Sequence, residues 1–168
     1  MKRITAAFIL FALACLLCAG CAKPAAQKTV SMYDLSRAML DAMQTEENMR
    51  YVSASDAGAE EKFARVSDTD YAHVEDFFLL YAENGAGNAD EIAVIAVKNE
   101  RDVSAAADSL RAHAEYRTQL YATYDPTQVP KLNDALVFTE GRYAVLIVCD
   151  DPAVVKAAFE MFLADGTS

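Results

Sequence analysis

The sequence predicts an α+β fold: a mainly antiparallel four-stranded sheet with helices packed against it, in the order hairpin, helix, hairpin, helix after an N-terminal helix. Two observations lead to this prediction. From residue 76 onward, two pairs of apolar segments are each joined by a short turn and each followed by a longer segment with helical periodicity. Residues 31–168 have the size of a single domain, and the chain is 54% apolar, which is sufficient for a core.

The first predicted element is a helix over residues 31–45, because its apolar residues recur at spacings of three and four. Ser31 is positioned to act as its N-cap. The apolar stripe consists of Met32, Leu35, Met39, Ala42 and Met43. A methionine-rich stripe serves either as core or as a binding surface for apolar partners, and we expect core here.

The segment after this helix has a weaker pattern. Residues 51–54 are compatible with a short strand and residues 58–62 with a loop. Residues 67–70 are typical of a helix start that leads into a short turn. Helix starts favour acidic side chains because of the local dipole, so Asp68 and Asp70 are not assigned to a metal site.

The first hairpin is predicted from residues 76–82 and 91–98, two apolar strands on either side of a turn rich in Gly and Asn. A long helix follows over residues 102–122. Its apolar side chains lie along one side, at Val103, Ala107, Leu110, Ala114 and Tyr121.

The second hairpin follows a connection over residues 124–133, which contains two prolines. Its strands are residues 135–139 and 142–149, joined by a tight turn. Asp151-Pro152 starts the last helix, because proline is favoured at the first helical position. This helix is expected to end at Gly166.

The two predicted halves also match in sequence. A shift of 51 residues aligns Ala93-Val94 with Ala144-Val145, and Ala106-Ala107 with Ala157-Ala158. An internal duplication would produce this match, and so would any apolar strand followed by an alanine-rich helix. The sequence leaves both explanations open.

Two of the predicted strands, residues 77–82 and 143–149, are apolar on both sides. A sheet with one face in water would show alternation instead. The second face must therefore be covered, either by the N-terminal helix or by another chain. We expect the helix of the same chain to cover it.

Residues 1–20 are predicted to be a lipoprotein signal peptide. Lys2-Arg3 precede an uncharged apolar run over residues 4–17, which is too short for a permanent membrane span. The following Cys18-Ala19-Gly20-Cys21 resembles the lipobox of bacterial lipoproteins, although Leu is usual where Cys18 stands. The resemblance implies a diacylglycerol on Cys21, which then becomes the first residue, with residues 21–30 as a tether. The alternative is an ordinary secretory peptide cut near Ala22.

The charge of the chain excludes one class of function. Its net charge is −10, and the leader contributes two of the positive charges, so the rest is more acidic still. Nucleic-acid binding requires Lys and Arg to neutralise phosphates, and we therefore expect none. Anionic headgroups would also repel the domain, so that attachment to a membrane depends on the acyl chains.

No set of residues in the sequence specifies a reaction. His73 and His113 lack the partners of a zinc site, and there is no phosphate loop or nucleophile elbow. Cys149 ends an apolar run and is expected to be a small buried hydrophobe. We expect no catalytic residues, no metal and no cofactor. An enzyme would require one of the histidines to converge with carboxylates in the fold.

The tyrosines are the candidate contacts for a ligand or partner. Tyr116 and Tyr121 lie in the C-terminal half of the predicted long helix, Tyr124 begins the connection after it, and Tyr143 lies at the start of the last strand. Ordinary packing between the helix and the following loop is the alternative explanation.

Three segments resemble a known family: the leader with its cysteine, residues 89–95 before the long helix, and residues 132–143 before the last strand and helix. On these the chain resembles an uncharacterised lipoprotein family found mainly in Gram-positive bacteria, domain of unknown function 4358. The resemblance implies a lipoprotein with an α+β domain and adds no chemistry.

The function expected from the sequence is that of a membrane-anchored lipoprotein on the extracytoplasmic face of the cell membrane. We expect a non-enzymatic interaction or accessory module of the cell envelope, in contact with an envelope protein or a second copy of itself through a sheet face or the tyrosine-rich loop. The alternative is binding of a small ligand, and an envelope enzyme is a third hypothesis.

Overall fold

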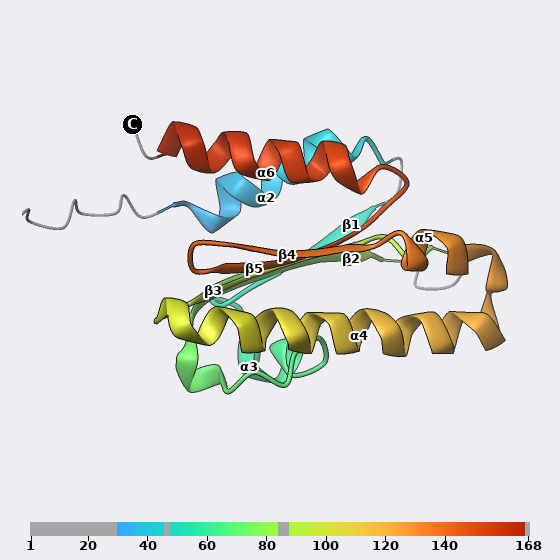
Figure 1. The fold of residues 1–168 in the computed structure, drawn as a ribbon, viewed down its shortest axis with the longest axis horizontal. Coiled ribbons are helices and arrows are strands. Elements are labelled where there is room, and N and C mark those ends of the chain that lie inside the picture. Colours follow the sequence, from blue (N-terminus) through green and yellow to red (C-terminus); the bar gives the residue numbers. More distant parts are fainter. Residues whose placement is uncertain (1–29, 46–47, 84–87, 167–168) are drawn as a thin grey trace, which may run out of the picture.

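The computed structural model describes residues 30–45, 48–83 and 88–166, which form three layers (Figure 1). A five-stranded sheet with the order β1-β2-β3-β5-β4 lies between two helical layers. Every pair of neighbouring strands is antiparallel. The predicted α+β class with a mainly antiparallel sheet is therefore confirmed, with one strand more than predicted.

The strands are β1 (Met49–Ser53), β2 (Val74–Ala82), β3 (Glu91–Val97), β4 (Leu136–Glu140) and β5 (Tyr143–Val148). The α-helices are α2 (Met32–Met43), α3 (Ala59–Phe63), α4 (Val103–Tyr124), α5 (Val129–Asn133) and α6 (Pro152–Gly166). Short 3-10 helices cover Tyr71–His73, Glu100–Asp102 and Pro126–Gln128.

The additional strand is β1, at the edge of the sheet next to β2. It contains most of the predicted short strand, and Val52 lies opposite Leu79. Its partner is more than twenty residues further along the chain. A pairing over this separation is a tertiary contact, and the local pattern of a five-residue strand contains no signal for it.

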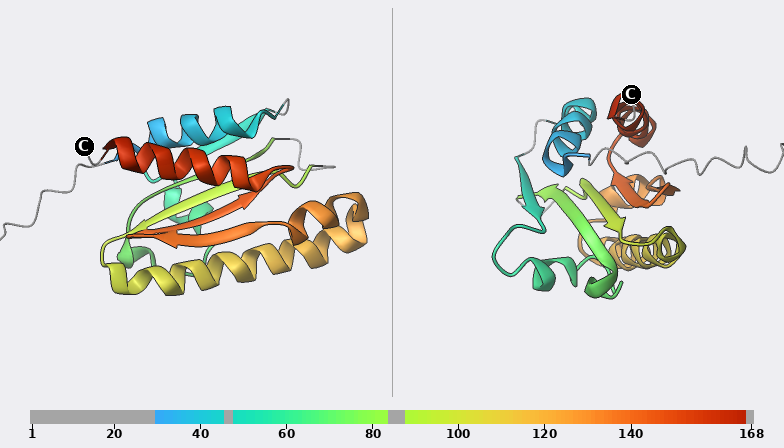
Figure 2. Two further views of the ribbon diagram at one scale, coloured as in Figure 1. Left: turned by 45° about the horizontal axis from the view of Figure 1, so that its top comes forward. Right: turned by 90° about the vertical axis from the view of Figure 1, so that its left-hand side faces the viewer.

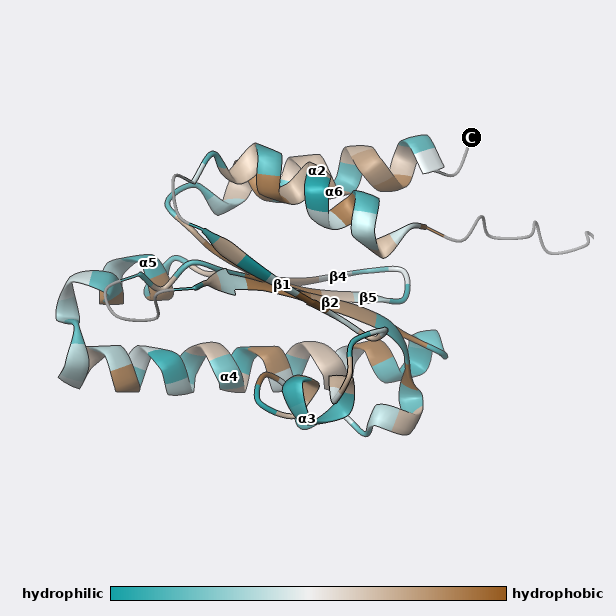
Figure 3. Ribbon diagram, turned by 180° about the vertical axis from the view of Figure 1, so that it is seen from behind, coloured by the Kyte–Doolittle hydropathy of each residue, from teal (hydrophilic) through white to brown (hydrophobic). Residues whose placement is uncertain are grey.

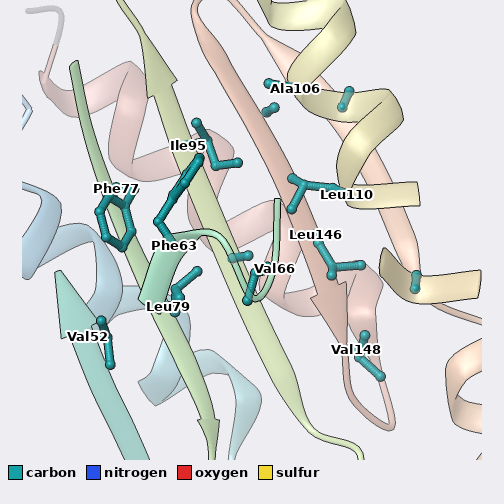
Figure 4. Close-up of a cluster of buried hydrophobic side chains, with 14 of the residues drawn as sticks. Val52, Phe63, Val66, Phe77, Leu79, Ile95, Ala106, Leu110, Leu146 and Val148 are labelled. Carbon is teal, nitrogen blue, oxygen red and sulfur yellow. The ribbon is translucent and has the colours of Figure 1, made fainter. Parts of the chain in front are cut away.

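One face of the sheet packs against α4 and α3 (Figure 1). Side chains alternate along each strand, so Phe77 and Leu79 of β2 and Ile95 of β3 point to this face. Figure 4 shows them with Phe63 of α3 and other members of the cluster. The remaining labelled residues are Val52, Val66, Ala106, Leu110, Leu146 and Val148.

The other face of the sheet packs against α2 and α6, which lie side by side (Figure 2). Phe78 of β2 and Ile92 of β3 point to this face, where Leu35 and Phe159 meet them from the two helices. The methionine stripe of α2 is therefore core. The strands that are apolar on both sides are covered by helices of their own chain, as predicted.

Several local predictions hold at the ends of elements. Ser31 caps α2, where its Oγ accepts a hydrogen bond from the Asp34 amide at 3.2 Å. Pro152 is the first residue of α6, and the Asp151 carboxylate accepts from the Val154 amide at 3.4 Å. Gly141 follows β4 with a φ of +52°, which a residue without a Cβ adopts easily.

Two segments predicted to be loops contain helix. Residues 58–62 were expected to be a loop, but α3 forms there because Phe63 anchors it to the sheet, 5.1 Å from the ring of Phe77. The connection over residues 124–133 contains a 3-10 turn and then α5, whose Leu132 is buried. In both segments one buried side chain stabilises a helix that is too short to have a periodic pattern.

The residues aligned by the internal sequence match occupy equivalent positions in the strands but not in the helices. Ala93 and Ala144 both point toward α4, on the neighbouring strands β3 and β5. However, α4 and α6 lie on opposite faces of the sheet (Figure 1). Ala106 is buried in the core, whereas the aligned Ala157 is exposed. The match between the helices therefore reflects their alanine content and not equivalent positions.

Residues 1–29 lie outside the described residues, and with them the predicted signal peptide and Cys21. Among the helices that are described, none combines the length and the apolar character needed to cross a membrane.

We expect Phe63→Ala to lower the free energy of unfolding by about 3–5 kcal/mol, because it empties a buried site between Phe77 and Tyr71. Chemical denaturation measures this change. Met161→Ala is the control, since 67% of Met161 is exposed, and it should change stability by less than about 0.5 kcal/mol. Equal effects of the two substitutions would show that α3 is not part of the core.

Candidate functional site

Helix α4, along which hydrophilic and hydrophobic residues alternate (Figure 3), carries the candidate site. Its inner side is built largely from small residues and packs closely on the sheet, with Ala106, Ala107, Leu110 and Ala114 buried. Further along the same helix, His113 and Arg117 point to the edge of the core, and Tyr116, Leu120 and Tyr124 point to solvent.

Glu91 is a buried carboxylate beneath α4. It is the first residue of β3. Because side chains alternate along a strand, it lies on the same face of the sheet as Ala93 and Ile95. His113 Nε2 lies 3.1 Å from Glu91 Oε2, and Arg117 Nη1 forms an ion pair with the same oxygen. His113 and Arg117 are four residues apart, so they lie one above the other on α4 and meet one carboxylate.

The two partners keep Glu91 ionised. Burial alone would raise the pKa of its carboxyl group, but the hydrogen bond with His113 and the charge of Arg117 outweigh burial and lower the pKa. Arg117 Nη1 also donates to the backbone oxygen of Ala89 at 3.0 Å. The carboxylate therefore acts as a charged anchor between the sheet and α4, and it is unsuited to donate a proton near neutral pH.

A second set of polar contacts holds the chain just before β3. Asp90 Oδ1 accepts from Lys131 Nζ of α5 at 2.6 Å, and its backbone amide donates to Asn88 Oδ1 at 2.9 Å. The Tyr121 hydroxyl donates to the backbone oxygen of Asn88 at 3.0 Å. Residues 88–91 are thus tied to α4 and α5 together.

A pocket of about 290 Å³ lies beside this network, between α4 and the segment that contains α3. Its charged lining residues are Lys62, Arg65, Asp90, Glu91 and Arg117. Its apolar lining residues are Val52 and Val66 with Leu79 and Ala82 of β2, and Tyr81, Asn88, His113 and Tyr121 complete the lining. No seryl or threonyl hydroxyl and no thiol belongs to this lining.

The structure keeps three of the four candidate tyrosines on α4, where the rings of Tyr121 and Tyr124 are 5.8 Å apart, and places Tyr143 elsewhere. Tyr116 and Tyr124 are 63% and 59% exposed on the outer side of α4. Tyr121 is buried on the inner side, with its ring 5.4 Å from the guanidinium carbon of Arg117. Tyr143 lies on the opposite face of the sheet, 6.0 Å from Phe159, because its strand position alternates away from α4. Tyr116 and Tyr124 therefore share a surface, and Tyr143 is remote from it.

Each histidine lies near a carboxylate. Such a convergence is the condition that an enzyme would require. His113 meets Glu91, and His73 Nδ1 lies 3.8 Å from Asp102 Oδ2. Within the described ranges, no three His, Cys, Asp or Glu residues are grouped for a metal ion. Burial raises the pKa of Cys149 to about 11, so its thiol is not a nucleophile near neutral pH. The expectation that the chain is not an enzyme stays a prediction.

Sequence reasoning missed the residues that define the pocket and the network. Glu91 was assigned only to a strand end, and Lys131 to a connection. The available signal was the spacing of four between His113 and Arg117, which places both on one side of a helix. Their common partner, Glu91, could not be predicted from the sequence, because the contact depends on which face of the sheet α4 covers.

Comparison with known proteins gives a family and no activity. The sequence model of a family described as "Domain of unknown function (DUF4358)" matches residues 52–149, from β1 to the end of the last strand. The match therefore includes α4, Glu91 and every residue of the pocket lining. No curated protein and no solved structure matches the chain significantly.

We expect Glu91→Gln to lower the free energy of unfolding by about 3–5 kcal/mol at pH 7, because it leaves Arg117 buried without its counter-charge. The pKa of Glu91 is lower in the folded state, so its contribution is complete above the unfolded pKa and disappears as pH falls through the folded pKa. The difference between the two proteins should therefore shrink below about pH 4.

Urea denaturation at pH 7 and at pH 3.5 measures this difference. Glu115→Gln is the matched control, since Glu115 is exposed on the same helix, and it should change stability by less than about 0.5 kcal/mol. A pH-independent loss in Glu91→Gln would contradict the ion-pair role and indicate a packing defect.

Proposed function

The chain belongs to the DUF4358 family, and on this premise we propose that it is a lipid-anchored module on the outer face of the cell membrane that binds an envelope protein through the exposed side of α4. The anchor is supported by the signal-peptide pattern and by Cys21 directly after it. Two acyl chains on that cysteine give stable membrane attachment, whereas one chain gives only marginal binding.

One observation carries the partner assignment: Tyr116, Leu120 and Tyr124 form an exposed ridge along α4. They are 63%, 47% and 59% exposed, and their spacing of four aligns them on one side of the helix. From Thr118 to Tyr124 no residue is charged, although 24% of the chain is charged. An apolar, uncharged ridge over two helical turns is typical of a surface that another protein covers.

The ridge is a better contact surface than the sheet. Both faces of the sheet are covered by helices of the same chain, so a partner cannot reach them without unfolding a layer. Tyrosine is enriched in interface hot spots, because it offers a large amphipathic surface with few rotamers to lose. We therefore assign the contact to α4 and not to a sheet face.

The partner that fits this ridge is a different protein with an apolar groove or helix face. A net charge of −10 makes association of two copies unfavourable, because each copy repels the other. A helix ridge with anchors at spacings of four matches recognition of a helix by a hydrophobic groove. A second copy of this chain would be the competing occupant.

We expect a photo-crosslinking residue at position 120 of the full-length protein in its own membrane to give one discrete heterologous product. Position 161 is the control, because Met161 is also apolar and exposed, 67% against 47% for Leu120, but lies on α6. The product should disappear in Tyr116→Ser/Tyr124→Ser and persist in Tyr33→Ser, since Tyr33 is 58% exposed on α2. A product containing only this chain, or equal products from both positions, would refute the assignment.

We expect labelled palmitate to be incorporated into the wild-type chain and into Cys18→Ala, and to be absent from Cys21→Ala, because the acyl chains require the thiol of residue 21. Gel fluorography of the purified protein from a lipoprotein-processing bacterium makes the measurement. Label that remains in Cys21→Ala would rule out the anchor. The crosslinking result is independent of this outcome, because the ridge lies in the folded domain.

A further inference from the structure

We propose that the pocket between α4 and α3 binds a small organic carboxylate with a compact apolar body. No residue of the ridge belongs to this site: α4 lines the pocket with His113, Arg117 and Tyr121, on the side that faces the sheet. Three features support it, namely the charge balance of the lining, the donors of Arg117 that make no hydrogen bond among the described residues, and the presence of apolar as well as charged side chains in the lining.

The lining carries an excess of positive charge in a protein that is strongly acidic overall. It contains three permanent cations, Lys62, Arg65 and Arg117, and two carboxylates, Asp90 and Glu91. Both carboxylates are already neutralised, Glu91 by Arg117 and Asp90 by Lys131 from outside the lining. Lys62 and Arg65 therefore have no counter-charge within the lining itself.

The carboxylates that pair with Lys62 and Arg65 differ in exposure: Glu61 is exposed, whereas Asp56 is partly buried. Lys62 Nζ is 3.2 Å from Asp56, and Arg65 Nη2 is 2.9 Å from Glu61, with both partners outside the lining. The Arg65 pair is more than two-thirds exposed on each side, so water screens it and its net contribution is small. Arg65 can therefore exchange its partner for an anion in the pocket, and Lys62 adds a second positive charge to the lining.

Arg117 is held in position to receive a planar anion. Its Nη1 makes the contacts with Glu91 and with the Ala89 backbone oxygen. Among the described residues, Nε and Nη2 make no hydrogen bond, and a guanidinium has five N–H donors in a fixed fork. A group anchored at one nitrogen and open at the others is suited to a carboxylate, which accepts two parallel hydrogen bonds.

The apolar part of the lining defines the rest of the ligand. Val52, Val66 and Leu79 belong to the same lining as the charged residues and offer no hydrogen bond from their side chains. A volume of about 290 Å³ is at the lower end of ligand sites, so the ligand is small. A free inorganic anion would leave this apolar part wet, whereas a carboxylate on a short branched or aromatic body fills it.

Benzoate is the probe, and benzamide, which has the same shape without the charge, is its control. Isothermal titration of the full-length protein in detergent should give saturable benzoate binding, at least about tenfold weaker binding in Lys62→Gln/Arg65→Gln, and unchanged binding in Arg111→Gln. Arg111 is an exposed cation of α4 that does not line the pocket. Benzamide should bind at least about tenfold more weakly than benzoate.

Proton NMR locates the site independently of the variants, because the chain has only two histidines. Benzoate should shift the ring signals of His113, which lines the pocket, and leave those of His73 unchanged. Absence of a His113 shift, equal binding of benzamide, or full benzoate binding in Lys62→Gln/Arg65→Gln would each overturn the proposal. If inorganic phosphate binds as tightly as benzoate, the ligand does not need an apolar body, and that part of the proposal is wrong.

Discussion

The three central strands β2, β3 and β5 are apolar on both faces, and this constraint determines the arrangement of the helices. Neither face can remain in water, so each requires its own helical layer. Helices α2 and α6 supply one layer and α4 supplies much of the other. The remaining part of the α4 face, over β1 and β2, is covered only by the short α3 and its flanking segments. The pocket lies at this incomplete edge of the layer.

Glu91 is the exception to the apolar character of β3, and its position explains the chemistry of the site. A buried carboxylate requires compensation, and His113 and Arg117 provide it from one side of α4. Such a triad contributes less to net stability than its Coulomb attraction indicates, because three polar groups lose water. The observed rotation of α4 about its axis turns His113 and Arg117 toward Glu91 of β3. That rotation also directs Tyr116 and Leu120 outward.

Helix α4 thus contributes residues to both proposed binding sites, the ridge for the partner protein and the pocket for the carboxylate. The same rotation places the ridge in solvent and the guanidinium of Arg117 against the pocket. The partner surface is uncharged, whereas the pocket is cationic, so the two sites select different chemistry. A lipid anchor at Cys21 would hold both at the membrane surface through the tether over residues 21–30.

The sequence by itself determined the α+β class, the two hairpins with their helices, the Ser31 cap and the start of α6, because these depend on local periodicity and capping. The proposed lipoprotein signal likewise rests on a linear motif, Cys18-Ala19-Gly20-Cys21 after an apolar run. Only the tertiary structure decided that β1 joins the sheet and that α4 and α6 lie on opposite faces. The meeting of Glu91 with His113 and Arg117 followed from that choice. These contacts join residues far apart in the chain, and the packing of whole layers selects them.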